Sequence, residues 1–154
     1  MFEKFARAAR TAVDGARHEA ERRGDRRIGT DHLLIALLED AAVARAAGID
    51  AGDARRAAER LDREALAAIG IRLTDWQPDR DAAPGRRVLF MTAGAKAVIR
   101  RTLAVAQAEK ARAITTRHLL LALLDQHQPD PATALLAALP IDQAALRLRL
   151  ATAA

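Results

Sequence analysis

The chain has 154 residues, of which 51% are hydrophobic and only 3% aromatic, and it contains no cysteine. This length fits one domain, or two small halves that share a core, and the lack of cysteine excludes disulfides and thiolate chemistry. The formal net charge is +5, but 25 basic residues are interleaved with 20 acidic ones, which favours solvated helix surfaces over a nucleic-acid site.

The composition predicts an almost entirely helical protein. There are only 8 glycines and 5 prolines, and β-branched residues are sparse, so little opposes helix formation. No apolar run approaches the roughly 18 residues of a membrane span. Residues 1–10 are amphipathic and lack the apolar core of a signal peptide. We therefore expect a cytoplasmic, all-α protein that does not contact a membrane.

An internal repeat organises the chain. Residues 28–40 read IGTDHLLIALLED, and residues 114–126 read ITTRHLLLALLDQ. A shift of 86 positions carries His32 to His118, and the match extends without a gap to the segments that precede each copy. A repeat of this length predicts two copies of one supersecondary unit that share a core.

Each copy contains a run of leucine, isoleucine and alanine that is apolar on every side of a helix. A helix of that kind is buried. Thr30 and Thr116 precede the two runs and are predicted to be N-cap residues, because a threonine hydroxyl accepts from a free amide at a helix start. The leucines expected in the shared core are Leu34, Leu37, Leu120 and Leu123.

We predict one domain, residues 1–154, with pseudo-twofold symmetry. Repeat one spans residues 2–70, and its four helices are expected at 2–23, 30–39, 41–47 and from 49–50 to 69. Residues 71–91, which hold the only tryptophan, are expected to connect the repeats. Repeat two spans residues 92–151, and its helices are expected at 92–111, 116–126, 131–139 and 142–150.

Two tandem four-helix units, each with a motif of the form I-G-T-D-H-L-L after a long first helix, resemble the Clp N-terminal domain. The opening residues M-F-E-K-F are similar to the start of ClpC. This family supplies the substrate- and adaptor-docking module of ClpA- and ClpC-type AAA+ unfoldases. The long segment 59–73 and the degenerate connector resemble stand-alone members of the family.

The resemblance implies a non-enzymatic module that binds proteins or peptides, as an accessory or decoy in Clp-dependent proteolysis. Its partners would be a Clp unfoldase, an adaptor or substrate peptides. The sequence contains no G-x-x-x-x-G-K-[ST] loop for phosphate and no serine for a catalytic triad. His32 and His118 recur at the starts of the apolar helices without metal-ligand spacing. We expect no catalytic residue, no metal and no cofactor.

The first candidate site is the pair Thr30 and Asp31. The resemblance implies that the acidic residue of this motif receives the guanidinium of a phosphorylated arginine, as in ClpC-type members of some bacteria. A carboxylate accepts a guanidinium well, and helix N-terminal amides favour an anion. Repeat two has Arg117 at the acidic position, so at most one such site is expected. The alternative is that Asp31 only complements the helix dipole.

The second candidate site is a groove formed by Phe2, Phe90 and Met91. In actinobacterial ClpC-like domains, an aromatic near the start and another near the second repeat line a groove that resembles the docking site of cyclic-peptide antibiotics. Phe2 matches the first position, and Met91, next to Phe90, matches the second. The alternative is that these side chains cap the cores of the two first helices.

Three functions remain open from the sequence. The first is a protein-binding module of the Clp machinery. The second is a sponge that protects ClpC from cyclic-peptide antibiotics. The third, less favoured, is a basic regulator that binds nucleic acid, for which a steep salt dependence of DNA affinity would be needed.

Overall fold

The computed structural model describes residues 2–72 and 90–152, with the backbone alone for residue 2. In chain order its elements are the 3-10 helix η1 (Phe2–Lys4), α1 (Arg7–Arg23), β1 (Arg27–Ile28), α2 (Thr30–Leu37), α3 (Ala41–Ala47), α4 (Ala51–Ala68), β2 (Phe90–Met91), α5 (Ala93–Ala108), α6 (Thr116–Leu124), α7 (Pro131–Ala138) and α8 (Gln143–Thr152). The predicted all-α fold of two tandem four-helix units is confirmed.

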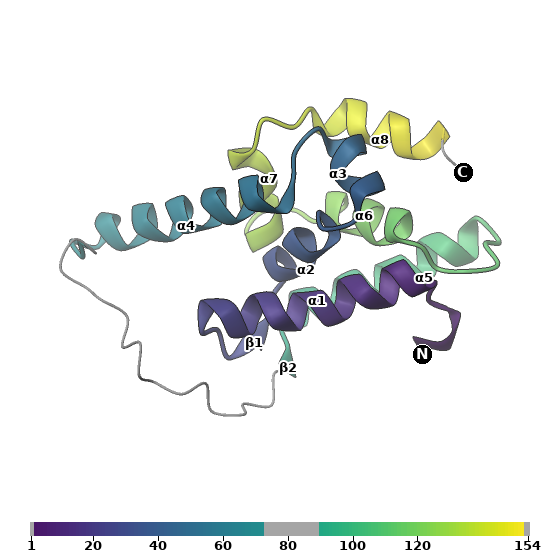
Figure 1. Ribbon diagram of the computed structural model, residues 1–154, viewed down its shortest axis with the longest axis horizontal. Helices are drawn as coiled ribbons and strands as arrows, with labels where there is room; N and C mark the ends of the chain where they lie inside the picture. Colours follow the sequence, from purple (N-terminus) through teal and green to yellow (C-terminus); the bar gives the residue numbers. More distant parts are fainter. Residues whose placement is uncertain (1, 73–89, 153–154) are drawn as a thin grey trace.

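The two apolar helices form the centre of the molecule. Helix α2 contacts α1, α4, α5, α6 and α7, and α6 contacts α5, α7 and α8 as well as α2. Figure 1 shows α2 in the middle, with α1 beneath it, α7 above it and α4 extending to the left. Leu37 and Leu123 are 0% exposed, and Leu34 and Leu120 are 1% exposed. The leucines predicted for the core are therefore buried there.

The first helix begins later than predicted. Residues 2–6 are not part of it: η1 is followed by a bridge between Phe5 and Ile114, and α1 starts at Arg7. The amide of Ala6 donates to the carbonyl of Ile114 at 2.8 Å, and the amide of Ile114 donates to the carbonyl of Lys4 at 2.9 Å. This segment is extended because it pairs with repeat two.

A second backbone pairing mirrors the first. Strands β1 and β2 run parallel, with Ile28 opposite Met91, and the amide of Thr92 donates to the carbonyl of Ile28 at 2.9 Å. The shift of 86 positions relates Ile28 and Met91 to Ile114 and Phe5. Each repeat thus places the segment before its first helix against the segment before the second helix of the other repeat. Strands this short leave no alternating pattern in a sequence.

Glycines end three helices as predicted, because each adopts a positive φ that other residues avoid. Gly24, Gly48 and Gly70 have φ of 74°, 76° and 84° after α1, α3 and α4. The predicted N-caps are wrong by one residue: Gly29 caps α2 and Thr115 caps α6. Thr30 and Thr116 are instead the first residues of these helices.

Candidate functional site

Thr30 joins two helices from different repeats. Its hydroxyl donates to the carboxylate of Asp130, at 2.9 Å from Oδ2, and accepts from the amide of Ala132 at 3.1 Å. Thr30 is only 1% exposed. The hydroxyl therefore links the start of α2 to the start of α7, which explains why it does not cap its own helix.

Asp31, the acidic residue of the first candidate site, already has a guanidinium partner. Arg23 at the end of α1 donates to the Oδ2 atom of Asp31 at 2.6 Å and to Asp62 of α4 at 2.9 Å. The Nε atom of Arg23 lies 3.5 Å from Asp25. Burial favours a lower pKa for Arg23, but the carboxylates, above all Asp31, outweigh it and raise the pKa. The Arg23 charge is thus held inside a cluster of acidic groups.

The equivalent position in repeat two has the same pairing with opposite signs. Arg117 donates to the carboxylate of Glu109 at 2.6 and 3.2 Å, and it also donates to the carbonyl of Leu150. The hydrogen bonds from Arg117 are the main cause that lowers the pKa of Glu109. The carboxylate of repeat two therefore comes from the end of α5 and not from the start of α6.

The two buried histidines use both ring nitrogens for internal contacts. The Nδ1 atom of His32 accepts from the Gly29 amide at 2.8 Å, and its Nε2 atom lies 2.8 Å from Asp25. In repeat two, Nδ1 of His118 accepts from the Thr115 amide at 2.9 Å, and its Nε2 atom lies 3.2 Å from Glu109. Since Nδ1 accepts, Nε2 carries the proton and donates to the carboxylate. Each histidine satisfies a backbone amide at its helix start, as the glutamate of a capping box does.

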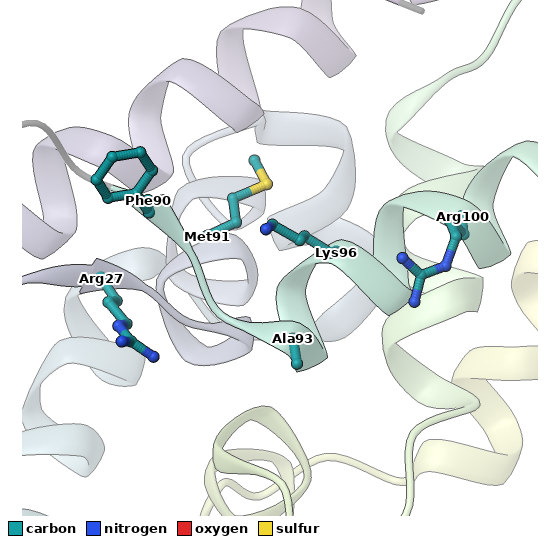
Figure 2. A pocket seen from close by; sticks show the side chains of 6 residues that line it. All are labelled: Arg27, Phe90, Met91, Ala93, Lys96 and Arg100. Atoms are coloured by element: carbon teal, nitrogen blue, oxygen red, sulfur yellow. The ribbon is translucent and has the colours of Figure 1, made fainter.

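The second candidate site forms a hollow of about 400 Å³ beside β2 and the first turns of α5. It is lined by Arg27, Phe90, Met91, Ala93, Lys96 and Arg100. Figure 2 shows Phe90 and Met91 on the β2 segment, with Lys96 and Arg100 along the helix that follows and Arg27 on the neighbouring strand β1. The hollow thus lies where the backbone of one repeat pairs with that of the other.

Phe90 and Met91 have different surroundings. Phe90 is 66% exposed, whereas Met91 is partly buried and packs against the core. Met91 therefore fits the core-capping alternative, and Phe90 does not. The side chain of Phe2 lies outside the described part of the chain, so its place in the groove stays a prediction.

The cations that line this hollow were missed in the sequence analysis. Arg27, Lys96 and Arg100 are exposed, and none of them forms an ion pair with a carboxylate among the described residues. Arg101, in contrast, lies one residue further along α5 and pairs with Asp125 at 2.8 Å. The available signal was the spacing of Lys96 and Arg100, which places both on one face of a helix.

A second hollow, of about 320 Å³, lies between α4 and α7. It is lined by Arg23, Asp31, Ala58, Leu61, Asp62, Ala65, Pro131, Ala134 and Leu135. Its polar edge is the ion cluster of Arg23, and its remaining wall is apolar. Asp31 therefore borders a surface hollow, but its carboxylate is turned toward Arg23.

No group of three or more histidine, cysteine, aspartate or glutamate side chains among the described residues is arranged to hold a metal ion. Within the same residues, no helix combines the length and the apolar character that crossing a membrane requires.

Comparisons with known proteins agree with the fold of two tandem repeats described above. The sequence matches the family described as "Clp repeat (R) N-terminal domain" over residues 4–73 and 90–154. No curated protein matches the sequence significantly.

Solved structures with the same fold include the N-terminal domain of the caseinolytic protease associated chaperone ClpD from Arabidopsis thaliana. It has 20% identity and a TM-score of 0.72, with 99% of each chain covered. The Hsp104 N-terminal domain from Candida albicans has 19% identity and a TM-score of 0.65, with 96% of this chain and 89% of the other covered. At such identities the likeness concerns the fold.

Proposed function

Because the chain belongs to the Clp N-terminal repeat family, we propose that it is a non-enzymatic docking module that binds a segment of a partner protein. The partner is a Clp unfoldase, an adaptor or a substrate of Clp-dependent proteolysis, and the module acts there as an accessory or a decoy. The proposed docking site is the hollow beside β2 and α5, which we call the β2–α5 groove.

The exposed ring of Phe90 is the observation that carries this proposal. A large apolar side chain that is 66% exposed inside a surface hollow gains free energy when a partner covers it. Aromatic residues are also enriched among the side chains that contribute most to protein–protein binding. Phe90 is therefore the expected anchor for a partner segment.

Backbone pairing between the two repeats fixes the strand beside the groove, which supports a preformed site. Strand β2 pairs with β1 of repeat one. Thr92, directly after β2, caps α5 by accepting from the amide of Ala95 at 3.1 Å. A site of fixed geometry loses less conformational entropy when it binds. The groove is thus suited to a peptide segment that orders itself on a rigid surface.

A capture experiment tests the proposal. The protein and its Phe90→Ala variant are used as bait in an extract of their own cytoplasm, and bound proteins are identified by mass spectrometry. We expect a Clp unfoldase, adaptor or substrate to bind the wild type and to be lost with Phe90→Ala. Ile69→Ala is the matched control, because Ile69 is 72% exposed and lies outside the groove.

Equal capture by the wild type and Phe90→Ala would place docking elsewhere on the molecule. A cyclic-peptide antibiotic that binds tightly through Phe90, with no protein captured, would instead favour the function of an antibiotic sponge.

A further inference from the structure

Positive charge is concentrated in the β2–α5 groove without internal compensation. Lys96 and Arg100 lie four residues apart on α5, where like charges repel each other, and Arg27 borders the same hollow. No carboxylate of the described residues pairs with any of the three.

We propose that the segment docked in the β2–α5 groove is an acidic peptide with one large apolar side chain. This inference rests on the proposed function and names the chemistry of the partner. The apolar side chain packs on Phe90 and Met91, and two carboxylates of the segment pair with Lys96 and Arg100. Arg27 adds to the positive potential on the β1 side of the groove.

The spacing of the two cations on α5 fixes the spacing of the carboxylates. A helix rises by about 1.5 Å per residue, so Lys96 and Arg100 are about 6 Å apart along the helix axis. In an extended peptide, residues two apart point to the same side and are separated by about 6.6 Å. Acidic residues at alternate positions therefore match the two cations. An apolar residue two positions before the first of them points to the same side of the peptide and so faces the groove as well.

The start of α5 adds to the preference for negative charge. Ala93 is the first residue of this 16-residue helix and lines the groove. The N-terminal turn of a helix carries a partial positive charge. Carboxylates near Lys96 thus face a cation and a helix dipole of the same sign.

A peptide fits these observations better than a nucleic acid. A nucleic-acid backbone presents evenly spaced phosphates and needs a basic track along a surface. Here the three cations surround one hollow of about 400 Å³ whose remaining lining includes Phe90 and Met91. This mixture of apolar side chains and confined charge matches a short acidic segment with an apolar anchor.

The test is a fluorescence-anisotropy titration of the full chain with a fluorescein-labelled peptide, Ala-Leu-Ala-Glu-Ala-Glu-Ala. Two further peptides replace either both glutamates by glutamine or the leucine by alanine. We expect saturable binding that weakens as salt is added, and about a tenfold loss of affinity for each altered peptide.

Variants of the protein locate the binding. Lys96→Glu and Arg100→Glu are each expected to weaken the acidic peptide about tenfold, whereas Arg101→Glu, which makes the same charge change one residue away, is expected to change the affinity less than twofold. A peptide with lysines in place of the glutamates is expected to prefer the double variant Lys96→Glu/Arg100→Glu over the wild type. This exchange of preference is a readout that unfolding of a variant does not produce.

Three outcomes of the binding titrations would overturn the inference. The first is no saturable binding, and the second is equal binding of the glutamate and glutamine peptides. The third is binding of a DNA duplex, and not of the peptide, that is lost in Lys96→Glu. If a partner is captured through Phe90 and Lys96→Glu does not change that capture, the docked segment is not acidic, and the proposed docking function still holds.

Discussion

Arg23 and Asp31 form an ion pair at 2.6 Å that recurs with exchanged charges, 86 residues later, as Glu109 and Arg117 at 2.6 Å. Both pairs join the end of the first helix of a repeat to the start of its second helix. The signs matter for the helix dipoles: Arg23 and Asp31 complement them, and Glu109 and Arg117 oppose them. The pairing therefore has the same structural role in both repeats. Asp31, the carboxylate predicted to receive a guanidinium of a ligand, pairs instead with Arg23 of the same chain.

This pair leads to a prediction about phosphoarginine. A phosphoarginine peptide must displace Arg23 from Asp31, so we expect weak binding to the wild type. Arg23→Gln should strengthen it by removing the competing guanidinium, and Asp31→Ala should remove most of the remaining affinity, since charge-assisted hydrogen bonds contribute ~1.5–3 kcal/mol each. Calorimetric titration of the wild type and both variants decides it. Unchanged binding in Asp31→Ala would reduce Asp31 to a helix-start residue.

Repeat two gives a related prediction, in which Arg117 is replaced by an acidic residue like the one at the equivalent position of repeat one. Arg117→Glu places a carboxylate at the start of α6 beside Glu109 and removes the only guanidinium that pairs with Glu109 among the described residues. We expect this variant to gain a weak site for the phosphoarginine peptide. NMR titration should show shifts around Glu109 that are absent from the wild type. Arg101→Glu is the control for added negative charge, and a similar gain there would contradict a specific site.

The central leucines give a prediction about stability. Leu37 is fully buried in α2, so Leu37→Ala leaves a cavity and should lower the free energy of unfolding by ~2–5 kcal/mol. Leu148→Ala is the control, because Leu148 is 70% exposed and its truncation should stay within ~0.5 kcal/mol. Urea denaturation followed by circular dichroism measures both. A small loss for Leu37→Ala would argue against a shared core around α2.

Glu19 gives a prediction about pH. It is 6% exposed, and burial acts to raise its pKa, but hydrogen bonds from Arg55 and Arg22 outweigh burial and bring the pKa below the ordinary value of 4.5. The unfolded chain therefore binds the proton first as the pH falls, so this contribution to stability is present above about pH 4.5 and is lost as the pH falls through the pKa of the folded state.

Glu19→Gln tests this contribution. We expect it to lower the free energy of unfolding at pH 7 by ~1–3 kcal/mol and to flatten its decline between pH 5 and pH 3. Glu21→Gln is the control, because Glu21 forms a half-exposed pair with Arg17 and should retain the decline. Parallel pH profiles for the wild type and Glu19→Gln would show that Glu19 is not the titrating group.

The histidines give a prediction about metal and catalysis. Both ring nitrogens of His32 are engaged inside the protein, so we expect no stoichiometric zinc. Because the sequence lacks a phosphate-binding loop, we also expect no ATP hydrolysis above background. His32→Ala should lower the free energy of unfolding by ~1–2 kcal/mol, because the Gly29 amide loses its acceptor. Elemental analysis and thermal unfolding are the measurements. Stoichiometric zinc that disappears in a folded His32→Ala protein would contradict this account.

The sequence predicted the features that depend on local pattern. The repeat, the glycine stops and the buried leucines follow from residue type and spacing along one helix. The helix start at Gly29 was not predicted, because glycine has no side chain that could accept from the first-turn amides. The contact at this start is the one from the Gly29 amide to Nδ1 of His32, three residues away. The partner of Asp31 was not predicted, because Arg23 lies across a turn and a strand.

The residues of the β2–α5 groove were also predicted only in part from the sequence. The shift of 86 positions identified Met91, and its neighbour Phe90 followed from adjacency. The cations around them could not be placed, because Arg27 reaches the groove only through the parallel pairing of β1 with β2. Which charges have partners is a property of the folded chain, and the total of +5 does not reveal it.

Docking in the β2–α5 groove is tested most directly by NMR shift mapping on the ¹⁵N-labelled chain, titrated with the acidic peptide Ala-Leu-Ala-Glu-Ala-Glu-Ala. The account predicts saturable shifts at Arg27, Phe90, Ala93, Lys96 and Arg100, and none in the hollow between α4 and α7. Shifts that cluster around Asp31, Leu61 and Leu135, or no saturable shifts in the groove, would contradict it.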